Sequence, residues 1–268
     1  MQALDHIVFN ARDRMDQVVA LFERLGFTVA PRGHHTLGSI NHVIVFEHDY
    51  LELLGYPPGK PPERRPELVA QPLGLMATVL ATSDADATHA NLIRRGLSPR
   101  PVQSFSRPVD LGEAGLHDAS FRVTRLEPDA VPGTWFYYCQ HLTPELVWRP
   151  EWQQHANHAQ GMASLEIAVP DVSTALPRYT ECLLGTQPET LGGSGPQASF
   201  RLQGCTLHLR QRAPPAAMTG LAFGVASLDS VAAHLTRSSV RFDIVNQTIL
   251  IDPAITLGAT LQFRTLAQ

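Results

Sequence analysis

Hydrophobic and polar positions in the first 55 residues predict a strand, a helix and two further strands. Residues 4–9 form an apolar run of strand length. Apolar side chains then recur at helical spacing over residues 15–26, and Gly26 stands where a helix commonly ends. Residues 41–46 and 50–54 are typical of strands, and the segment 57–62, rich in proline, ends this first unit.

The same order of elements returns three times along the chain. Strands are predicted at 75–82, 163–169 and 220–226, and each precedes a helical stretch, at 87–95, 173–184 and 230–236. Two later strands close each unit: 121–124 and 135–139, then 198–202 and 205–209, then 249–252 and 259–263. An aspartate marks the turn into each of the four helices: Asp13, Asp84, Asp171 and Asp229. We therefore predict four repeated units of one strand, one helix and further strands.

These units are expected to pack in pairs, because one such unit cannot cover its own sheet. Residues 149–160, rich in Gln, His and Trp, separate the second unit from the third. We therefore expect two domains, residues 1–150 and residues 161–268.

Composition limits the class of protein. The 268 residues are 44% hydrophobic and can bury one large core or two ordinary ones. With 21 Lys and Arg against 25 Asp and Glu, we expect no nucleic-acid partner, and the apolar runs are too short to cross a membrane. The three cysteines, Cys139, Cys182 and Cys205, form no CxxC pair and resemble reduced thiols. A soluble, cytoplasmic protein is therefore expected.

The motifs of the first unit resemble a known superfamily. The opening strand LDHIVF, the segment GSIN at 38–41 and the strand YLELLG at 50–55 are similar to the glyoxalase-like branch of the vicinal oxygen chelate superfamily. The final segment GATLQF at 258–263 resembles the usual last strand of that superfamily. The resemblance implies an α+β fold, in which four βαβββ modules pair into two cupped mixed sheets, as in glyoxalase and dihydroxybiphenyl dioxygenase.

The resemblance also implies a divalent metal on the concave face, held by side chains of the first and fourth strands of each module. His6 and Glu52 occupy these positions in the first module, and Fe, Mn, Ni, Co or Zn suits such donors. The second module has Ala77, which cannot bind a metal, and then Cys139. His141, two residues on, shares the strand face of Cys139. The expected ligands are His6, Glu52 and His141. The simpler alternatives are that His6 is a hydrogen-bonded histidine of the core and that His141 is a polar residue at a strand end.

The corresponding positions of the second half carry a poorer set of donors. They are Ser164, His208, Leu221 or Ala222, and Gln262, none of which is a carboxylate. We therefore expect a degenerate copy of the first half, which supports it or forms a dimer surface. Paired modules can come from one chain or be exchanged between chains, so a homodimer is a further expectation.

Other polar residues are candidates for substrate contact. Asn41 can orient a substrate oxygen, and His42, near His34 and His35, can transfer a proton near neutral pH. The alternative is that these histidines face solvent.

Three residues later in the first half are further candidates for substrate binding. Arg122 can pair with a carboxylate substrate or face solvent. Trp148 and Arg149 can close over the cup or pack between the two halves.

Two functions fit these observations. The first is a metal-dependent enzyme for a small substrate with adjacent oxygen atoms, by isomerase, lyase or dioxygenase-type chemistry, with Asn41 and His42 as catalytic residues. The second is a metal-free protein that binds a small molecule in the same cup. The incomplete ligand set and the aromatic strand 135–138 favour the second hypothesis.

Overall fold

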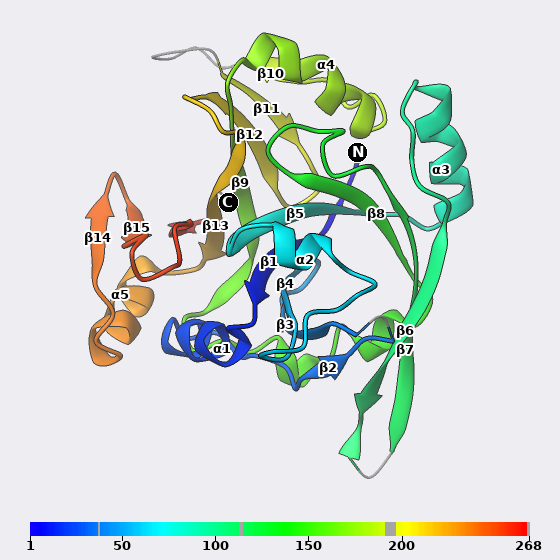
Figure 1. The fold of residues 1–268 in the computed structure, drawn as a ribbon. Coiled ribbons are helices and arrows are strands. Elements are labelled where there is room, and N and C mark those ends of the chain that lie inside the picture. Colours follow the sequence, from blue (N-terminus) through cyan, green and yellow to red (C-terminus); the bar gives the residue numbers. More distant parts are fainter. Residues whose placement is uncertain (37, 113–114, 191–196, 267–268) are drawn as a thin grey trace.

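The chain folds into two eight-stranded mixed sheets with few helices (Figure 1), which confirms the expected α+β class. The computed structural model describes residues 1–36, 38–112, 115–190 and 197–266. The strand order of the first sheet is β2-β3-β4-β1-β5-β8-β7-β6, and that of the second is β10-β11-β12-β9-β13-β16-β15-β14. Each sheet therefore consists of two consecutive βαβββ modules, as predicted.

The first sheet contains the first two modules. The first module consists of β1 (Leu4–Arg12), α1 (Met15–Arg24), β2 (Gly33–His34), β3 (Ile40–Val45) and β4 (Tyr50–Gly55). The short helix α2 (Glu67–Ala70) leads to the second module, which consists of β5 (Gly74–Ala81), α3 (Ala85–Arg94), β6 (Gln103–Asp110), β7 (Leu116–Arg125) and β8 (Trp135–His141). Strand β1 runs parallel to β4 and antiparallel to β5, so the two modules join along β1 and β5.

The second sheet repeats this arrangement after two short 3₁₀ turns, Pro144–Leu146 and Pro150–Trp152. The third module consists of β9 (Ala159–Val169), α4 (Val172–Cys182), β10 (Glu189–Thr190), β11 (Gln197–Arg201) and β12 (Thr206–Gln211). The fourth consists of β13 (Ala217–Val225), α5 (Leu228–Arg237), β14 (Phe242–Val245), β15 (Thr248–Ile251) and β16 (Thr260–Thr265). Strands β2, β6, β10 and β14 were not predicted individually, because two are very short and the others are largely polar or exposed.

The recurrent aspartates do not all have the same role. Asp84 and Asp171 accept hydrogen bonds from backbone N–H groups of the first turns of α3 and α4, and so cap these helices. Helix α5 is capped by Ser227, while Asp229 lies in its first turn. No side chain caps α1, so Asp13 does not repeat the role of Asp84.

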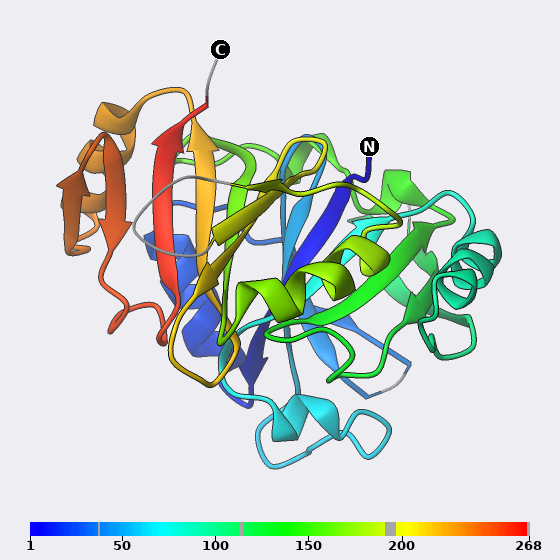
Figure 2. The same ribbon diagram turned by 90° about the horizontal axis from the view of Figure 1, so that it is seen from above.

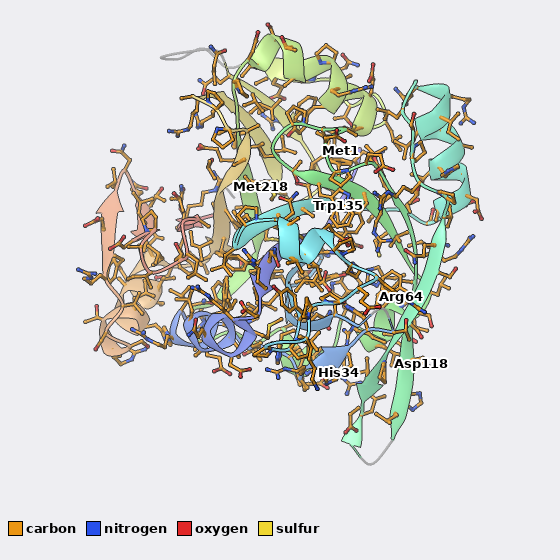
Figure 3. All side chains as sticks on the ribbon, in the orientation of Figure 1. Met1, His34, Arg64, Asp118, Trp135 and Met218 are labelled. Carbon is orange, nitrogen blue, oxygen red and sulfur yellow. The ribbon has the colours of Figure 1, made fainter. Side chains whose placement is uncertain are left out.

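The first sheet curls until its two outermost strands meet. Strands β2 and β6 lie at opposite ends of the strand order, yet they contact each other. In the second sheet the corresponding strands, β10 and β14, stand far apart (Figure 1). The hairpin of β6 and β7 also extends beyond the rest of the first sheet, and Asp118 lies in this extension (Figure 3). The first sheet is therefore a nearly closed cup, whereas the second is open.

One continuous apolar core joins the two sheets. Phe27 packs against Phe223 and Phe263 of the second sheet, with ring centroids 4.7 and 5.8 Å apart. Helix α4 lies beside the first sheet (Figure 2), where the hydroxyl group of Tyr138 donates a hydrogen bond to the carbonyl of Cys182 at 2.9 Å. Among the helices of the described residues, none has the length and apolar character needed to span a membrane.

Two buried titratable groups lie at the junction of the sheets. Asp49 accepts a hydrogen bond from the backbone N–H of Met162 at 3.3 Å, and burial raises the pKa of its carboxyl group to about 8. His155 accepts from the N–H of Thr28 at 3.1 Å and donates to the carbonyl of Val45 at 3.0 Å. Burial lowers the pKa of this imidazole to about 4. Both groups are therefore neutral at pH 6.5.

Asp49 should make the protein less stable as the pH rises above 6.5. Its pKa is raised in the folded state, so the folded chain holds a proton that the unfolded chain releases above pH 4. Between pH 6.5 and 7.5 the free energy of unfolding should fall by about 1.4 kcal/mol, the linkage slope for one proton. His155 opposes this fall slightly, because its imidazole is neutral in the folded chain while the unfolded imidazole still releases protons near pH 6.5. Urea unfolding of the parent and of D49N at these two pH values isolates the contribution of Asp49, which D49N should remove.

Candidate active site

A narrow cavity lies inside the cup of the first sheet. It is lined by alternate residues of β3, β4, β6, β7 and β8 and by His6 of β1. The period of two along each strand explains this, because Tyr50, Glu52 and Leu54 of β4 all face the cavity. The polar residues that line it include His6, His35, Asn41, Glu52 and Tyr137. The cavity therefore contains His6 and Glu52, the first two of the three predicted ligands.

An irregularity in β1 places Asp5 beside His6. In a regular strand Asp5 and His6 would face opposite sides of the sheet. The register between β1 and β5 shifts between Leu4 and His6, and this irregularity brings the side chain of Asp5 to that of His6. Its Oδ1 atom accepts hydrogen bonds from His6 Nδ1 at 2.5 Å and from His141 Nε2 at 3.1 Å. The ring of His6 also stacks on Tyr50, with centroids 4.4 Å apart. Asp5 thus fixes the ring of His6 and leaves Nε2 free to face the cavity.

The carboxyl groups of Asp5 and Glu52 are both ionised at neutral pH. Burial would raise the pKa of Asp5, but the charge and hydrogen bond of His141 and the contact with His6 outweigh it and lower that pKa. Burial likewise opposes ionisation of Glu52, but the neighbouring imidazoles of His6 and His35 and a hydrogen bond from Asn41 lower its pKa.

Glu52 is held at the centre of the polar wall. Its Oε1 atom accepts a hydrogen bond from Asn41 Nδ2 at 2.7 Å and lies 3.9 Å from His35 Nε2. Its Oε2 atom lies 3.8 Å from His6 Nε2. Burial lowers the pKa of His35 to about 4, so this imidazole is neutral at neutral pH. The result is an ionised carboxylate between two imidazole rings, fixed in place by an amide.

Tyr137 is a residue of the site that the sequence analysis missed. Its hydroxyl group lies 3.4 Å from His6 Nε2. In the first module His6 pairs with Tyr50, and Glu52 lies two residues after that partner. In the second module Ala77, the counterpart of His6, pairs with Trp135, and Tyr137 lies two residues after it. Tyr137 is therefore the counterpart of Glu52. From the sequence, Cys139 was expected at this position instead, two residues further on. Burial raises the pKa of Tyr137, which keeps its phenol protonated.

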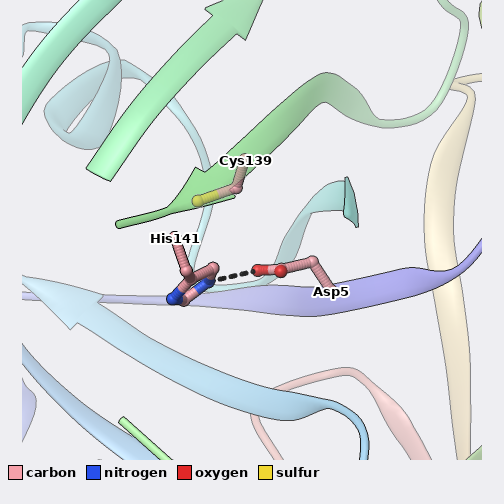
Figure 4. Close-up of side chains that lie close together, drawn as sticks. All are labelled: Asp5, Cys139 and His141. Atoms are coloured by element: carbon pink, nitrogen blue, oxygen red, sulfur yellow. Dashed lines mark hydrogen bonds and ion pairs between the residues drawn. The ribbon is translucent and has the colours of Figure 1, made fainter. Parts of the chain in front are cut away.

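His141 joins a second group of donors next to the cavity. Asp5, Cys139 and His141 each offer one potential ligand atom, and these atoms lie within 4.8 Å of one another (Figure 4). Burial raises the pKa of Cys139, so its side chain is a thiol. The Nδ1 atom of His141 is buried and has no hydrogen-bond partner among the described residues, and its ring packs on Trp148 at 4.8 Å. Asp5 links this group to His6.

Of the candidates Asn41, His42 and Arg122, only Asn41 lines the cavity. Asn41 lines the cavity, but the next residue, His42, faces the other side of β3, where it contacts the carbonyl of Ala30 at 2.8 Å. Arg122 lies outside the lining and forms two contacts with Asp86, at 2.8 and 3.0 Å.

Trp148 and Arg149 lie beyond the end of β8. Trp148 packs on His141 and, at 5.7 Å, on Tyr50, behind the cavity wall. Arg149 pairs with Glu151 and lies over the ring of Trp152. Of the two, Trp148 therefore contacts residues of the site.

The hairpin of β6 and β7 supplies five further lining residues: Phe105, Arg107, Phe121, Val123 and Arg125. Sequence reasoning missed Phe105 and Arg107 because β6 was not recognised. The available signal was the alternation of Phe105, Arg107 and Val109 with smaller polar residues and a proline.

The second sheet offers no comparable arrangement. Glu166, which pairs with His208 in the strand register, forms ion pairs with Arg210 and Arg212 on a partly exposed face. Across the described ranges, Asp5, Cys139 and His141 are the one group of three or more His, Cys, Asp or Glu donors close enough to share a metal.

Comparison with known proteins agrees with this architecture. The model of the family described as "Glyoxalase-like domain" matches residues 4–183, which is more than half of the chain. The chain belongs to the glyoxalase-like domain family. The resemblance to the vicinal oxygen chelate superfamily is thereby confirmed. No curated protein matches the sequence of this glyoxalase-like protein.

Solved structures show the same fold at low sequence identity. A hypothetical protein from Staphylococcus aureus has a TM-score of 0.72 and 10% identity, over 99% of this chain and 100% of that one. A fusion of a xylose isomerase-like TIM barrel with 4-hydroxyphenylpyruvate dioxygenase has a TM-score of 0.69 and 12% identity, over 99% of this chain and 49% of that one. A mutant of 4-hydroxymandelate synthase from Streptomyces coelicolor has a TM-score of 0.61 and 10% identity, over 99% and 93% of the chains.

The donors of the glyoxalase-like protein fit a divalent metal at one position. Two donors that share a metal at about 2.1 Å lie roughly 3.0–3.4 Å apart. His6 Nε2 and Glu52 Oε2, at 3.8 Å, need only a small side-chain adjustment to reach this spacing. The bond from His6 Nδ1 to Asp5 is also the arrangement by which metal-binding imidazoles are usually oriented. His6 and Glu52 would therefore supply two of the ligands that a divalent metal needs at this position.

Proposed function

We propose that this glyoxalase-like protein is a metal-dependent enzyme that acts on a small substrate with two adjacent oxygen atoms, by lyase, isomerase or dioxygenase-type chemistry. The approach of His6 Nε2 to Glu52 Oε2 inside the cavity, with His6 oriented by Asp5, carries the proposal. The names of two structural neighbours, a dioxygenase fusion and a synthase, support a catalytic role for this fold.

In this proposal His6 and Glu52 hold the metal, which is Fe, Mn, Ni, Co or Zn. When bound, the metal supplies a Lewis acid for the substrate oxygen atoms. Asp5 keeps the imidazole of His6 oriented, and Asn41 keeps the carboxylate of Glu52 in place. His141, which is bonded to Asp5, belongs to the supporting network.

The other residues of the cavity bind substrate and control protons. Tyr137 keeps its proton at neutral pH and can donate a hydrogen bond to a substrate oxygen. Neutral His35 can accept a proton or a hydrogen bond on the opposite side of Glu52. His42 lies on the outer face of β3, where its Nδ1 atom bonds to the carbonyl of Ala30, and it has no part in this proposal. The aromatic walls exclude water from this group.

We further propose that residues 1–150 carry the functional site and that residues 161–268 support it. The open second sheet and the paired charges of Glu166 support this assignment. The three cysteines are free and buried, in line with a reducing compartment such as the cytoplasm.

One observation favours a second candidate function, metal-free binding of a small molecule in the same cavity. The second module contributes Ala77 and a protonated Tyr137 where the first contributes His6 and Glu52. Half of a symmetric ligand set is therefore missing, and the lining offers hydrogen-bonding groups and aromatic rings that need no metal to bind a ligand.

Metal content separates the two functions. We expect close to one metal ion per chain, measured by plasma mass spectrometry after reconstitution with Fe, Mn, Ni, Co or Zn and dialysis. The double variant H6A/E52A should lose this metal, because both proposed donors are gone, and turnover of α-hydroxyketones or catechols should fall at least 10³-fold, a typical effect of removing a catalytic centre.

The matched control is H42Q, which removes a buried histidine from the outer face of the same sheet. It should retain the metal. A parent protein without metal after every reconstitution would contradict the enzyme proposal and leave the binding function. Metal retained by H6A/E52A would place the metal elsewhere, with Asp5, Cys139 and His141 as the next candidates.

A further inference from the structure

The closing hairpin of the cup carries a buried cation without a partner. Arg107 of β6 is 5% exposed and lines the cavity. Within the described part of the chain, no hydrogen bond or ion pair is made by its guanidinium group. Burying a charge is costly unless an opposite charge or hydrogen bonds compensate it, and arginine stays protonated even when burial lowers its pKa. Glu52 in the same cavity attracts this charge, but no carboxylate of the described residues lies within ion-pair distance of Arg107.

A second arginine faces the same space. Arg125 of β7 donates a hydrogen bond to Gln103 at 2.8 Å and lies over the rings of Phe105 and Tyr137, at 5.7 and 5.3 Å. Neither ring nor amide neutralises its charge. By contrast, Arg65 at the cavity wall has its own carboxylate partner, Glu67, at 2.6 Å.

The charges of the lining do not balance. Arg65, Arg107 and Arg125 line the same cavity, and Glu52 is the one carboxylate among its lining residues. Arg65 already pairs with Glu67 outside the lining, so Arg107 and Arg125 share Glu52 alone. The negative charge of a monoanion would complement the second of these two arginines.

The walls of the cavity present flat aromatic surfaces. The rings of Phe105 and Phe121 are stacked, with centroids 5.2 Å apart and an angle of 25° between their planes. The stacked rings of His6 and Tyr50 form another flat surface of the lining. Aromatic faces of this kind bind planar groups well, and arginine binds a carboxylate through two parallel hydrogen bonds.

Gly33 shows that the position of Arg107 depends on close packing where the cup closes. A Cβ atom at Gly33 would lie 2.4 Å from Asn41 Oδ1 and 3.2 Å from two atoms of Arg107. Strand β2 therefore approaches β6 closely enough to fix both the amide that holds Glu52 and the guanidinium group of Arg107.

We propose that Arg107 and Arg125 form an anion subsite, and that the natural ligand of this cavity is a planar organic monocarboxylate. The carboxylate binds Arg107, the planar part lies along the aromatic walls, and the oxygen-bearing end points to His6 and Glu52. This assignment rests on the proposed function in so far as it takes the same cavity as the substrate site.

Pairs of probes that differ in one charge test the subsite. Benzoate, salicylate and 4-hydroxybenzoate are compared with benzamide, salicylamide and 4-hydroxybenzamide by calorimetric titration of the full chain. At least one carboxylate should bind about tenfold or more tightly than its amide, as expected for hydrogen bonds between charged groups. R107Q should abolish this preference, whereas R107K should retain part of it, because the charge remains but the forked geometry is lost.

The control variant is R122Q, which removes an arginine of the same hairpin that pairs with Asp86 outside the cavity. It should bind the probes as the parent does. R125Q is a second test should R107Q fail to fold, and it should also weaken carboxylate binding. Equal binding of carboxylates and amides, no binding of any carboxylate, or a preference that survives in R107Q would overturn the subsite.

Metal analysis of the same samples distinguishes this proposal from the proposed function. A parent without metal whose carboxylate preference disappears in R107Q would contradict the metal-dependent enzyme and support the subsite. A parent that holds metal but shows no carboxylate preference would do the reverse.

Discussion

Replacing Phe27 by alanine is expected to lower the free energy of unfolding by about 3–5 kcal/mol, the usual cost of removing a buried aromatic ring. Phe27 is 3% exposed and lies where the two sheets meet. Its ring contacts Phe46, Phe223 and Phe263, so the resulting cavity cannot be filled by the movement of one neighbour alone. Urea unfolding followed by circular dichroism measures the loss.

The matched control is F242A, which removes a phenylalanine that is only partly buried on the outlying strand β14. We expect it to cost about 1 kcal/mol, because less apolar surface leaves water in the native fold. A loss below about 1 kcal/mol for F27A, or separate unfolding of the two sheets in the parent, would contradict a single core through Phe27.

Removing the side chain of Asp5 is expected to damage both stability and the site. D5A leaves the buried rings of His6 and His141 without their common acceptor, and breaking a buried pair in this way costs roughly 3–5 kcal/mol. The ring of His6 also loses the bond that aims Nε2 at Glu52. We therefore expect a large fall in the free energy of unfolding and a fall in metal retention at least as large as tenfold.

An exposed aspartate serves as the control for this prediction. D86A removes a carboxylate that pairs with Arg122 at the surface, and exposed pairs contribute little to stability. Unfolding curves and metal content are measured for both variants. If D5A matched D86A in both measurements, Asp5 would have no role in orienting His6.

Local pattern was sufficient for most of the fold. The spacing of Val18, Leu21 and Phe22 depends only on helical geometry, so α1 was predicted within two residues of its observed end. Strand β6 was not predicted, because its outward positions are polar and its inward ones, Phe105 and Arg107, are not uniformly apolar. A strand that lines a polar cavity lacks the simple alternation on which such predictions depend.

Local pattern also decided which side of a strand a residue faces. It did not by itself decide the role of each residue. Glu52 lies between two leucines and faces the cavity as expected. Asn41 and His42 were considered together, yet adjacent residues of a strand point to opposite faces, and only Asn41 lines the cavity.

The sequence by itself determined the four modules and their pairing, because hydrophobic periodicity and strand alternation are properties of neighbouring residues. It placed His6 and Glu52 on the cupped face through the resemblance of the first module to a known superfamily. Only the tertiary structure decided that Asp5 lies beside His6, that Tyr137 stands opposite it, and that Arg107 faces the same cavity. The first depends on an irregular register in β1, the second on the pairing of β5 with β8, and the third on closure of the cup between β2 and β6. Each is set by contacts between segments far apart in the chain, which no local pattern records.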